Sequence, residues 1–243
     1  MSEAVKTLLS SGADPNICSS KGNSPLQYAV EARIPESIQP LLDHGAIVDH
    51  CDIKGQTALH YAAIHQSDLT CYRPLIEAGA DPNRATIPGV RLLSCAILEH
   101  HYEAVVYLVQ NGADINLKGQ NDRSPIFYAV EYNNHATLEF LHEQGADCTV
   151  ASLDWPTIAH VAAHFADIET LHILSTFQLE LDNIECVDRD GLSIPEIIDK
   201  RVRDSLGDDN AFVEAFSQFL RSVGNKSDNE EIFHDAMEEV ATN

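Results

Sequence analysis

The chain has 243 residues, of which 44% are hydrophobic and 22% are charged, which is typical of a folded domain and unlike a disordered chain. Its formal net charge at pH 7 is −23. This charge repels phosphate backbones and anionic lipid surfaces, so we expect no nucleic-acid partner, no membrane partner and a monomeric protein.

The N-terminus, MSEAVKTLLSSG, lacks the basic segment and apolar stretch of a secretory signal. No window approaches the roughly 20 apolar residues that cross a bilayer. We therefore expect a cytoplasmic location, with the nucleus as the alternative. The six cysteines are scattered and form no Cys-x-x-Cys pair. That distribution predicts small apolar core residues and neither disulfides nor a metal site.

The dominant feature of the chain is a repeated Gly-Ala pair. Its glycines are separated by 33, 34, 33 and 33 residues, at Gly12, Gly45, Gly79, Gly112 and Gly145. A second segment keeps the same period and reads GNSPLQYAV, GQTALHYAA, GVRLLSCAI, DRSPIFYAV and WPTIAHVAA, followed by a looser GLSIPEII. A fixed period of 20 to 50 residues predicts a repeat architecture.

Each repeat has the pattern of two helices and a loop. A hydroxyl residue precedes the first helix and is expected to cap it, at Ser24, Thr57, Ser124, Thr157 and Ser193. Pro25 and Pro125 follow at a first-turn position that tolerates proline. The second helix ends at a glycine, for example Gly112, suited to a left-handed turn. One such unit cannot bury its own apolar stripe, so we expect the units to stack.

These segments resemble the ankyrin repeat family, whose consensus contains Gly-x-Thr-Pro-Leu-His-x-Ala-Ala and ends in Gly-Ala-Asp-x-Asn. The resemblance covers residues 1 to about 200. The chain departs from the consensus where Arg91 replaces the threonine, Trp155 replaces the glycine and Gln178 stands at the last Gly-Ala position. The resemblance implies an all-α ankyrin repeat solenoid of stacked helix-turn-helix units with projecting loops, an N-terminal half-repeat and a helical C-terminal cap.

We expect the repeats to occupy residues 1–203, as a half-repeat 1–18, units 19–51, 52–85, 86–118, 119–151 and 152–187, and a divergent unit 188–203. A capping helix is expected within 204–223, because apolar residues from Phe212 to Leu220 follow a helical period. We expect residues 224–243 to be an acidic amphipathic tail. Two interpretations of its segment 230–241 stay open: it docks on a partner, or it folds back onto the last repeat.

The family resemblance also implies where partners bind, namely at the loop tips and on the inner face of the first helices. Counting from the capping position gives these candidate contacts: Lys54, Gln56, His65, Glu99, Arg123, Glu131, Tyr132, Asp154, Trp155, His164 and Phe165. The same count places Lys21, Ile53 and Ile87 at tips and Glu31 and Ile64 on the inner face. Mixed aromatic and charged side chains are typical of protein recognition, although any one of them could simply face solvent. We therefore expect an adaptor or scaffold that binds a protein partner in a concave groove.

Twelve histidines raise the alternative of metal chemistry. His160 and His164 have the i, i+4 spacing of a zinc-binding helix, but the glutamate that would activate water is missing between them. His160, like His60, also occupies the family's consensus position, which implies a role in packing and in hydrogen bonds between loops. Asp188-Arg189-Asp190-Gly191 lacks the later glutamate of a calcium loop. We expect no metal and no cofactor.

A second function stays open, that of a small-molecule-binding protein or an enzyme. The sequence contains no assembled catalytic motif, which favours binding over catalysis. An enzyme would depend on acid–base chemistry in an apolar pocket near Trp155 and Phe165. Its candidate residues are those that the repeat would place side by side: His65, Glu99, Tyr132 and His164.

Overall fold

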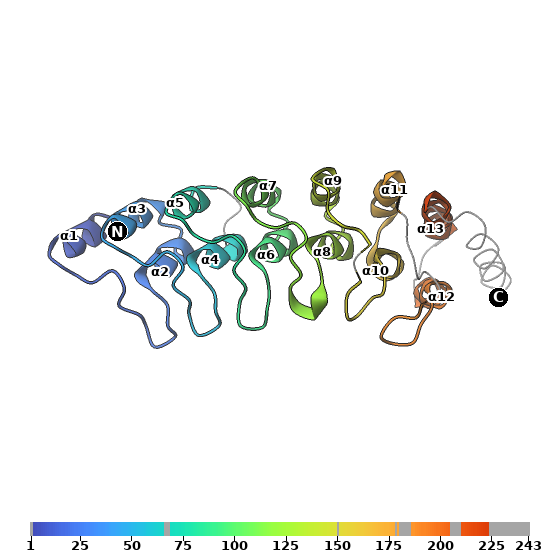
Figure 1. Ribbon diagram of the computed structural model, residues 1–243, viewed down its shortest axis with the longest axis horizontal. Coiled ribbons are helices and arrows are strands. Elements are labelled where there is room, and N and C mark those ends of the chain that lie inside the picture. The colour runs from blue at the N-terminus through green and yellow to red at the C-terminus, as the bar shows by residue number, and fades with distance from the viewer. Residues whose placement is uncertain are drawn as a thin grey trace. The chain divides into compact units, whose positions relative to one another are not determined.

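The computed structural model describes residues 2–65, 69–149, 151–177, 179, 186–204 and 210–223 (Figure 1). The regular elements of these ranges are helices, and Ala85 and Arg91 form an isolated antiparallel bridge. None of the described helices is long and apolar enough to span a membrane. Gln178 and the tail 224–243, with both interpretations of segment 230–241, lie outside the described residues. The chain divides into two compact units, unit 1 (residues 1–120) and unit 2 (residues 121–243).

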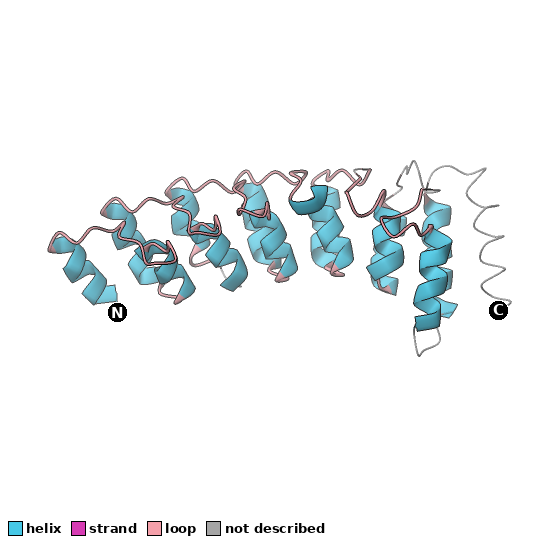
Figure 2. Ribbon diagram, turned by 90° about the horizontal axis from the view of Figure 1, so that it is seen from below, coloured by secondary structure: helices cyan, strands magenta, loops and turns pink. Residues whose placement is uncertain are grey.

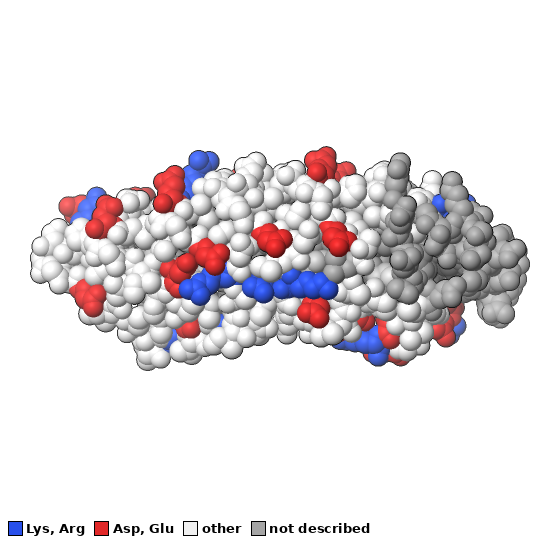
Figure 3. Space-filling view, viewed as in Figure 1, with Lys and Arg blue, Asp and Glu red and all other residues white. Residues whose placement is uncertain are grey.

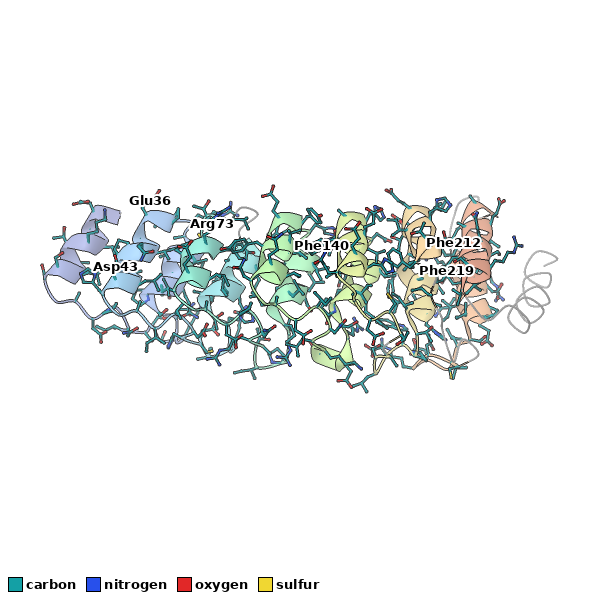
Figure 4. All side chains as sticks on the ribbon, turned by 45° about the horizontal axis from the view of Figure 1, so that its top comes forward. Glu36, Asp43, Arg73, Phe140, Phe212 and Phe219 are labelled. Atoms are coloured by element: carbon teal, nitrogen blue, oxygen red, sulfur yellow. The ribbon has the colours of Figure 1, made fainter. Side chains whose placement is uncertain are left out.

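Unit 1 has two rows of helices. The inner row, on the side of the projecting loops, consists of α2 (Pro25–Glu31), α4 (Ala58–His65) and α6 (Leu92–Leu98), each packed on the next. The outer row contains α1 (Ser2–Ser10), α3 (Ile38–Asp43), α5 (Tyr72–Glu77) and α7 (Tyr102–Gln110), with the 3-10 turn η1 (Pro35–Ser37) leading into α3. Figure 4 shows Asp43 and Arg73 on outer-row helices. The N-terminal half-repeat is therefore α1, which packs on α3.

Unit 2 repeats this arrangement after the turn η2 (Gln120–Asp122) at the boundary. Its inner row is α8 (Pro125–Glu131), α10 (Ile158–Phe165) and α12 (Ile194–Asp204), and its outer row is α9 (His135–Glu143), α11 (Ile168–Thr176) and α13 (Asn210–Ser222). The capping helix is α13, which packs on α11. Its apolar face is buried through Phe212 and Phe219, labelled in Figure 4.

Small residues allow the inner-row helices to approach one another. Ala62 and Ala96 are fully buried, and Leu59 and Leu92 beside them are at most 1% exposed. Burying one leucine side chain contributes about 1.5–3 kcal/mol, which a single repeat could not achieve by itself. The stacking expected from the repeat period is thus present within each unit.

The caps of the inner helices differ in part from the prediction. Ser24 caps α2, because its Oγ accepts a hydrogen bond from the backbone N–H of Gln27 at 3.3 Å. The prediction is wrong at α4, where the Thr57 hydroxyl bonds instead to Nδ1 of His60 at 2.9 Å. The cause is the third residue of the helix, whose imidazole engages the hydroxyl before the backbone can.

The first helices of the other repeats also begin without a simple cap by a hydroxyl group. Thr157 bonds to Nδ1 of the histidine three positions later, and Ser193 bonds to the carboxylate of Glu196. Ser124 makes no side-chain cap bond to α8. The prolines behave as predicted, since α2 and α8 both begin at one.

The projecting loops are joined in register at their tips, where Figure 2 shows them along one edge of each unit. In unit 1, Ile53 N donates to Lys21 O at 3.3 Å and Ile87 N to Lys54 O at 2.8 Å. Gly55 must be glycine there, because it has a φ of +74° and a Cβ atom would lie 2.7 Å from Ile87 N. In unit 2, Arg189 N donates to the carbonyl of Asp154 in the same way.

Candidate functional site

Unit 1 contains a pocket of about 430 Å³ between its loop tips and its inner row, here called the unit 1 pocket. Three groups of side chains line it. The tips contribute Lys21, Ile53 and Lys54, the helices contribute Tyr28, Glu31, Ile64 and His65, and the floor contains Asn23, Asp52, Gln56 and Tyr61. The structure thus brings together the predicted residues Lys54, Gln56 and His65.

A hydrogen-bond network fixes the floor of this pocket. Asn23 Nδ2 donates to the Tyr61 hydroxyl at 2.6 Å, and that hydroxyl donates to Asp52 Oδ2 at 3.1 Å. Asp52 Oδ1 accepts the backbone N–H groups of Lys54 and Gln56, both at 2.8 Å. Burial, and to a smaller extent the Asp52 carboxylate, raise the pKa of Tyr61 to about 12, so the phenol stays protonated. The floor is therefore rigid before any ligand arrives.

Sequence reasoning missed Tyr61 and Asp52 as members of this site. The available signal was the position of Asp52 at the start of a loop that turns through Gly55, because an aspartate there can accept N–H groups two and four residues later. Asp188 does the same in unit 2, where Oδ1 accepts from Asp190 N and Leu192 N at 2.9 Å. The tyrosine that completes the floor had no signal in sequence.

Basic side chains are not evenly spread over unit 1. On the face seen in Figure 3, Lys and Arg lie beside α4 and α6 in unit 1 and beside α8 in unit 2, with acidic groups above them. The Arg91 guanidinium in unit 1 is anchored to the backbone, because it donates to the carbonyls of Lys118 at 3.0 Å and Asn83 at 3.1 Å. This explains the departure from the consensus threonine, because the arginine ties one loop to the next.

Unit 2 has a charged cluster around Arg123. Its guanidinium bonds to Glu131 at 2.8 Å and to Asp154 at 2.5 Å, and lies 4.2 Å from the centre of the Trp155 ring. Asp154 also bonds to Arg189 at 2.9 Å. All of the predicted residues Arg123, Glu131, Asp154 and Trp155 therefore meet, but Asp154 and Trp155 are buried. Their placement makes them supports of the tip, and a direct contact with a partner stays a prediction.

The environment of this cluster sets the pKa of each carboxyl group. Burial raises the pKa of Glu131 above its usual range, although Arg123 opposes the shift. Burial also acts to raise the pKa of Asp154, but hydrogen bonds from Arg123, Asn121 and Arg189 outweigh it and lower that pKa overall. Asp154 therefore holds its charge more firmly than Glu131 does.

His164 and Phe165 end α10 beside Trp155. The Phe165 ring meets the Trp155 ring edge-on, with 5.5 Å between centroids and an interplanar angle of 82°. His164 Nε2 lies 2.8 Å from Oδ2 of the buried Asp188. Burial acts to raise the pKa of Asp188, but the N–H of Leu192 and the His164 bond lower it overall. The bond to Asp188 therefore holds the His164 imidazole in one orientation, with Nε2 toward the loop tip.

The four candidate acid–base residues divide between the units. In unit 1, Glu99 follows α6 and is exposed, while the His65 ring lies 6.0 Å from that of Tyr61. In unit 2, Tyr132 is 44% exposed, and His164 bonds to Asp188. Acid–base chemistry by this set stays a prediction. Among the described residues, no group of three or more His, Cys, Asp or Glu side chains is placed to hold a metal ion.

Comparisons with known proteins agree on the architecture. A family model described as "Ankyrin repeats (3 copies)" matches residues 1–86 and 92–190. The transient receptor potential channel pyrexia of Drosophila melanogaster is 29% identical over 152 residues, covering 62% of this chain and 12% of that protein. The putative ankyrin repeat protein FPV244 of fowlpox virus is 33% identical over 113 residues, covering 46% of this chain and 16% of that protein.

The crystal structure of the human ASB11 ankyrin repeat domain matches with a TM-score of 0.70 at 21% identity, covering 97% of this chain and 92% of that chain. This similarity shows the fold. The chain spans only a small part of the two curated relatives named above, so their whole-protein activities are not transferred to it. The family model, which covers most of the residues, shows that the chain belongs to the ankyrin repeat family.

Proposed function

We propose that this chain is an adaptor or scaffold that binds a protein partner against its loop tips and inner helices. Ankyrin repeat domains generally mediate protein–protein interactions. The observation that supports the proposal here is a set of large aliphatic side chains left in water at the tips. Ile53 and Ile87 are 64% and 73% exposed in unit 1, and Leu153 is 70% exposed in unit 2.

The register of these side chains is what distinguishes them from scattered surface residues. Ile53 and Ile87 hold the same place in successive tips, and each donates its backbone N–H to the preceding tip. A single exposed aliphatic residue needs no explanation, but neighbouring ones on one edge form the apolar patch that a partner covers. We also propose, as expectations carried over from the sequence, that the protein is monomeric and cytoplasmic or nuclear.

Affinity capture from an extract of the source cell tests this function. We expect a protein that is captured by the wild type and lost at least tenfold with Ile87→Asp in unit 1 or with Tyr132→Ala and Phe165→Ala in unit 2. Leu8→Asp is the matched control, because Leu8 is 61% exposed on the outer-row helix α1. Equal loss with Leu8→Asp, or no protein that distinguishes the variants, would contradict the proposal.

The size of the unit 1 pocket favours one alternative function. Its volume of about 430 Å³ lies in the roughly 300–1,000 Å³ range of small-molecule sites. We propose as the second candidate a small-molecule-binding protein or enzyme that uses this groove. Metabolite binding or turnover lost with His65→Ala, a residue that lines this pocket, while protein capture is unchanged, would support the second candidate over the first.

A further inference from the structure

Two exposed lysines, Lys21 and Lys54, lie on the tip side of the unit 1 pocket. Lys21 and Lys54 are exposed, and both directly precede a tip glycine. The backbone bond from Ile53 N to Lys21 O holds their two tips side by side. Neither ammonium group forms an ion pair among the residues that the structure describes. In a chain of net charge −23, two neighbouring cations without a carboxylate partner form a local anion-attracting edge.

The acidic groups of the pocket lie in its floor and on its helix side, away from the tips. Asp52 lies in the floor, where its carboxylate accepts two backbone N–H groups and the Tyr61 hydroxyl. Glu31 lies on the helix side, at the end of α2. The pocket is therefore polarised, with positive charge at the tips and negative charge at the helix ends.

Between these edges the pocket also has three large side chains that offer apolar surface. Tyr28 is 45% exposed and Ile53 is 64% exposed, and both face the pocket together with Ile64. The floor offers a ligand few free polar groups, since Asn23 donates to Tyr61 and Tyr61 donates to Asp52. An apolar side chain is the group that such walls bind best, because it is removed from water without leaving a polar partner unsatisfied.

We propose, resting on the protein-binding function above, that the unit 1 pocket takes an extended segment of the partner in which one Asp or Glu lies beside a large apolar residue. The carboxylate faces Lys21 and Lys54, and the apolar side chain lies between the walls formed by Tyr28, Ile53 and Ile64. We expect the bound segment to contain only one acidic residue. A run of acidic residues is repelled by the net charge of −23, whereas one carboxylate gains from the lysine pair at short range and loses little to the long-range field.

Selection from a displayed library of random nine-residue peptides on the full chain tests this proposal. We expect the wild type to enrich peptides with one Asp or Glu next to Leu, Ile, Phe or Met. The variant with Lys21→Glu and Lys54→Glu should enrich Lys or Arg at that position instead. It should bind the wild-type peptides about tenfold more weakly, since each exposed charge pair contributes a few-fold in affinity.

The matched control is Lys6→Glu, which reverses one lysine, half the charge change of the double variant, at an exposed site on α1 and should leave the selected sequences unchanged. Thermal unfolding of each variant checks that the fold is retained. No enrichment by the wild type, enrichment without an acidic residue, or the same preference after both lysine reversals would overturn the proposal. Any of these results together with a partner lost on Ile87→Asp would remove this inference and leave the protein-binding function standing.

Discussion

Gln27 in α2 and His60 in α4 hold the same place in successive repeats and make the same bond to the start of their helices. Oε1 of Gln27 accepts from Ser24 N at 2.7 Å, and Nδ1 of His60 accepts from Thr57 N at 3.2 Å. The Gln27 amide also donates to Gln56 O of the next loop at 2.6 Å. A glutamine can therefore replace the consensus histidine in this fold, and of the two side chains only the histidine titrates.

Replacing His60 by Gln should flatten the pH dependence of stability. Burial lowers the pKa of His60 to about 4 from 6.5, so the unfolded chain binds more protons between these values. The stability of the wild type should therefore fall as the pH drops from 6.5 to 4, by about 3 kcal/mol from this group. Urea unfolding at pH 7.5 and at pH 4.5 should show a smaller difference for His60→Gln.

The reciprocal change serves as the control for that measurement. Gln27→His introduces a titrating group into an equally buried place and should steepen the same pH dependence. Carboxylates titrate alike in all three proteins, so the differences between them isolate the imidazole. Identical slopes for the wild type and His60→Gln would mean that His60 is protonated in the fold without cost.

Replacing Asp49 by Asn should stabilise unit 1 by about 1 kcal/mol at pH 7. At the matching place in the first repeat, Asn16 donates to Gly45 O and accepts from Ile47 N, both at 2.9 Å. Asp49 accepts from Asp81 N at 3.2 Å, but an ionised carboxylate has no proton to donate to a carbonyl. The denaturant midpoint measures the gain.

The pH dependence of this gain provides its own check. Burial raises the pKa of Asp49, so ionised Asp49 disfavours folding, and this penalty disappears as the carboxyl group is protonated at low pH. The advantage of Asp49→Asn should therefore shrink near pH 3. The opposite change, Asn83→Asp, should destabilise the fold, because Asn83 donates to Gly112 O at 2.9 Å. A destabilised Asp49→Asn protein would show that the carboxylate is preferred there.

Two residues between paired helices, His100 and Asn133, have a left-handed backbone conformation, and we expect opposite effects when each is replaced by glycine. His100 has a φ of +56°, is exposed, and should be replaceable by glycine with a gain of roughly 0.5–1 kcal/mol, since the relief of strain exceeds the entropy cost of glycine. Asn133 has a φ of +50°, but its side chain donates to Phe165 O at 3.0 Å and accepts from Asp167 N at 2.8 Å. Asn133→Gly should therefore destabilise unit 2. Opposite shifts in the thermal midpoint are the expected result, and a loss in both variants would contradict it.

Periodic features of this fold could be predicted from sequence, and contacts between side chains could not. The stacking alanines and the turn glycines repeat with the period, so Ala62 and Gly112 were placed correctly by counting. Counting also placed Trp155 at a tip, but there is no glycine turn at this position, and its ring is buried under the guanidinium of Arg123. Such pairings depend on which side chains neighbouring loops bring into contact, and the sequence of one repeat does not predict them.

Removing the Arg123 side chain should destabilise unit 2 strongly. Arg123, Glu131 and Asp154 have side chains only 14%, 13% and 8% exposed, so Arg123→Ala would leave two carboxylates largely buried without their shared cation. Losing one partner of a buried pair costs about 3–5 kcal/mol. Denaturant unfolding at pH 7 measures the loss, and Arg123→Lys should fall between, because an ammonium keeps the charge without the planar fork that reaches both carboxylates.

A second substitution, at Glu131, should restore part of the stability that Arg123→Ala loses. Burial already raises the pKa of Glu131, and Arg123 is the described side chain that opposes this shift. Without Arg123, Glu131 should bind a proton more readily than Asp154, which keeps Arg189 and Asn121. Adding Glu131→Gln to Arg123→Ala removes the unpaired charge and should restore part of the lost stability. If the double variant is as unstable as Arg123→Ala, the contribution of Arg123 comes from its packing on Trp155 and its pair with Asp154, because both contacts are absent from both proteins.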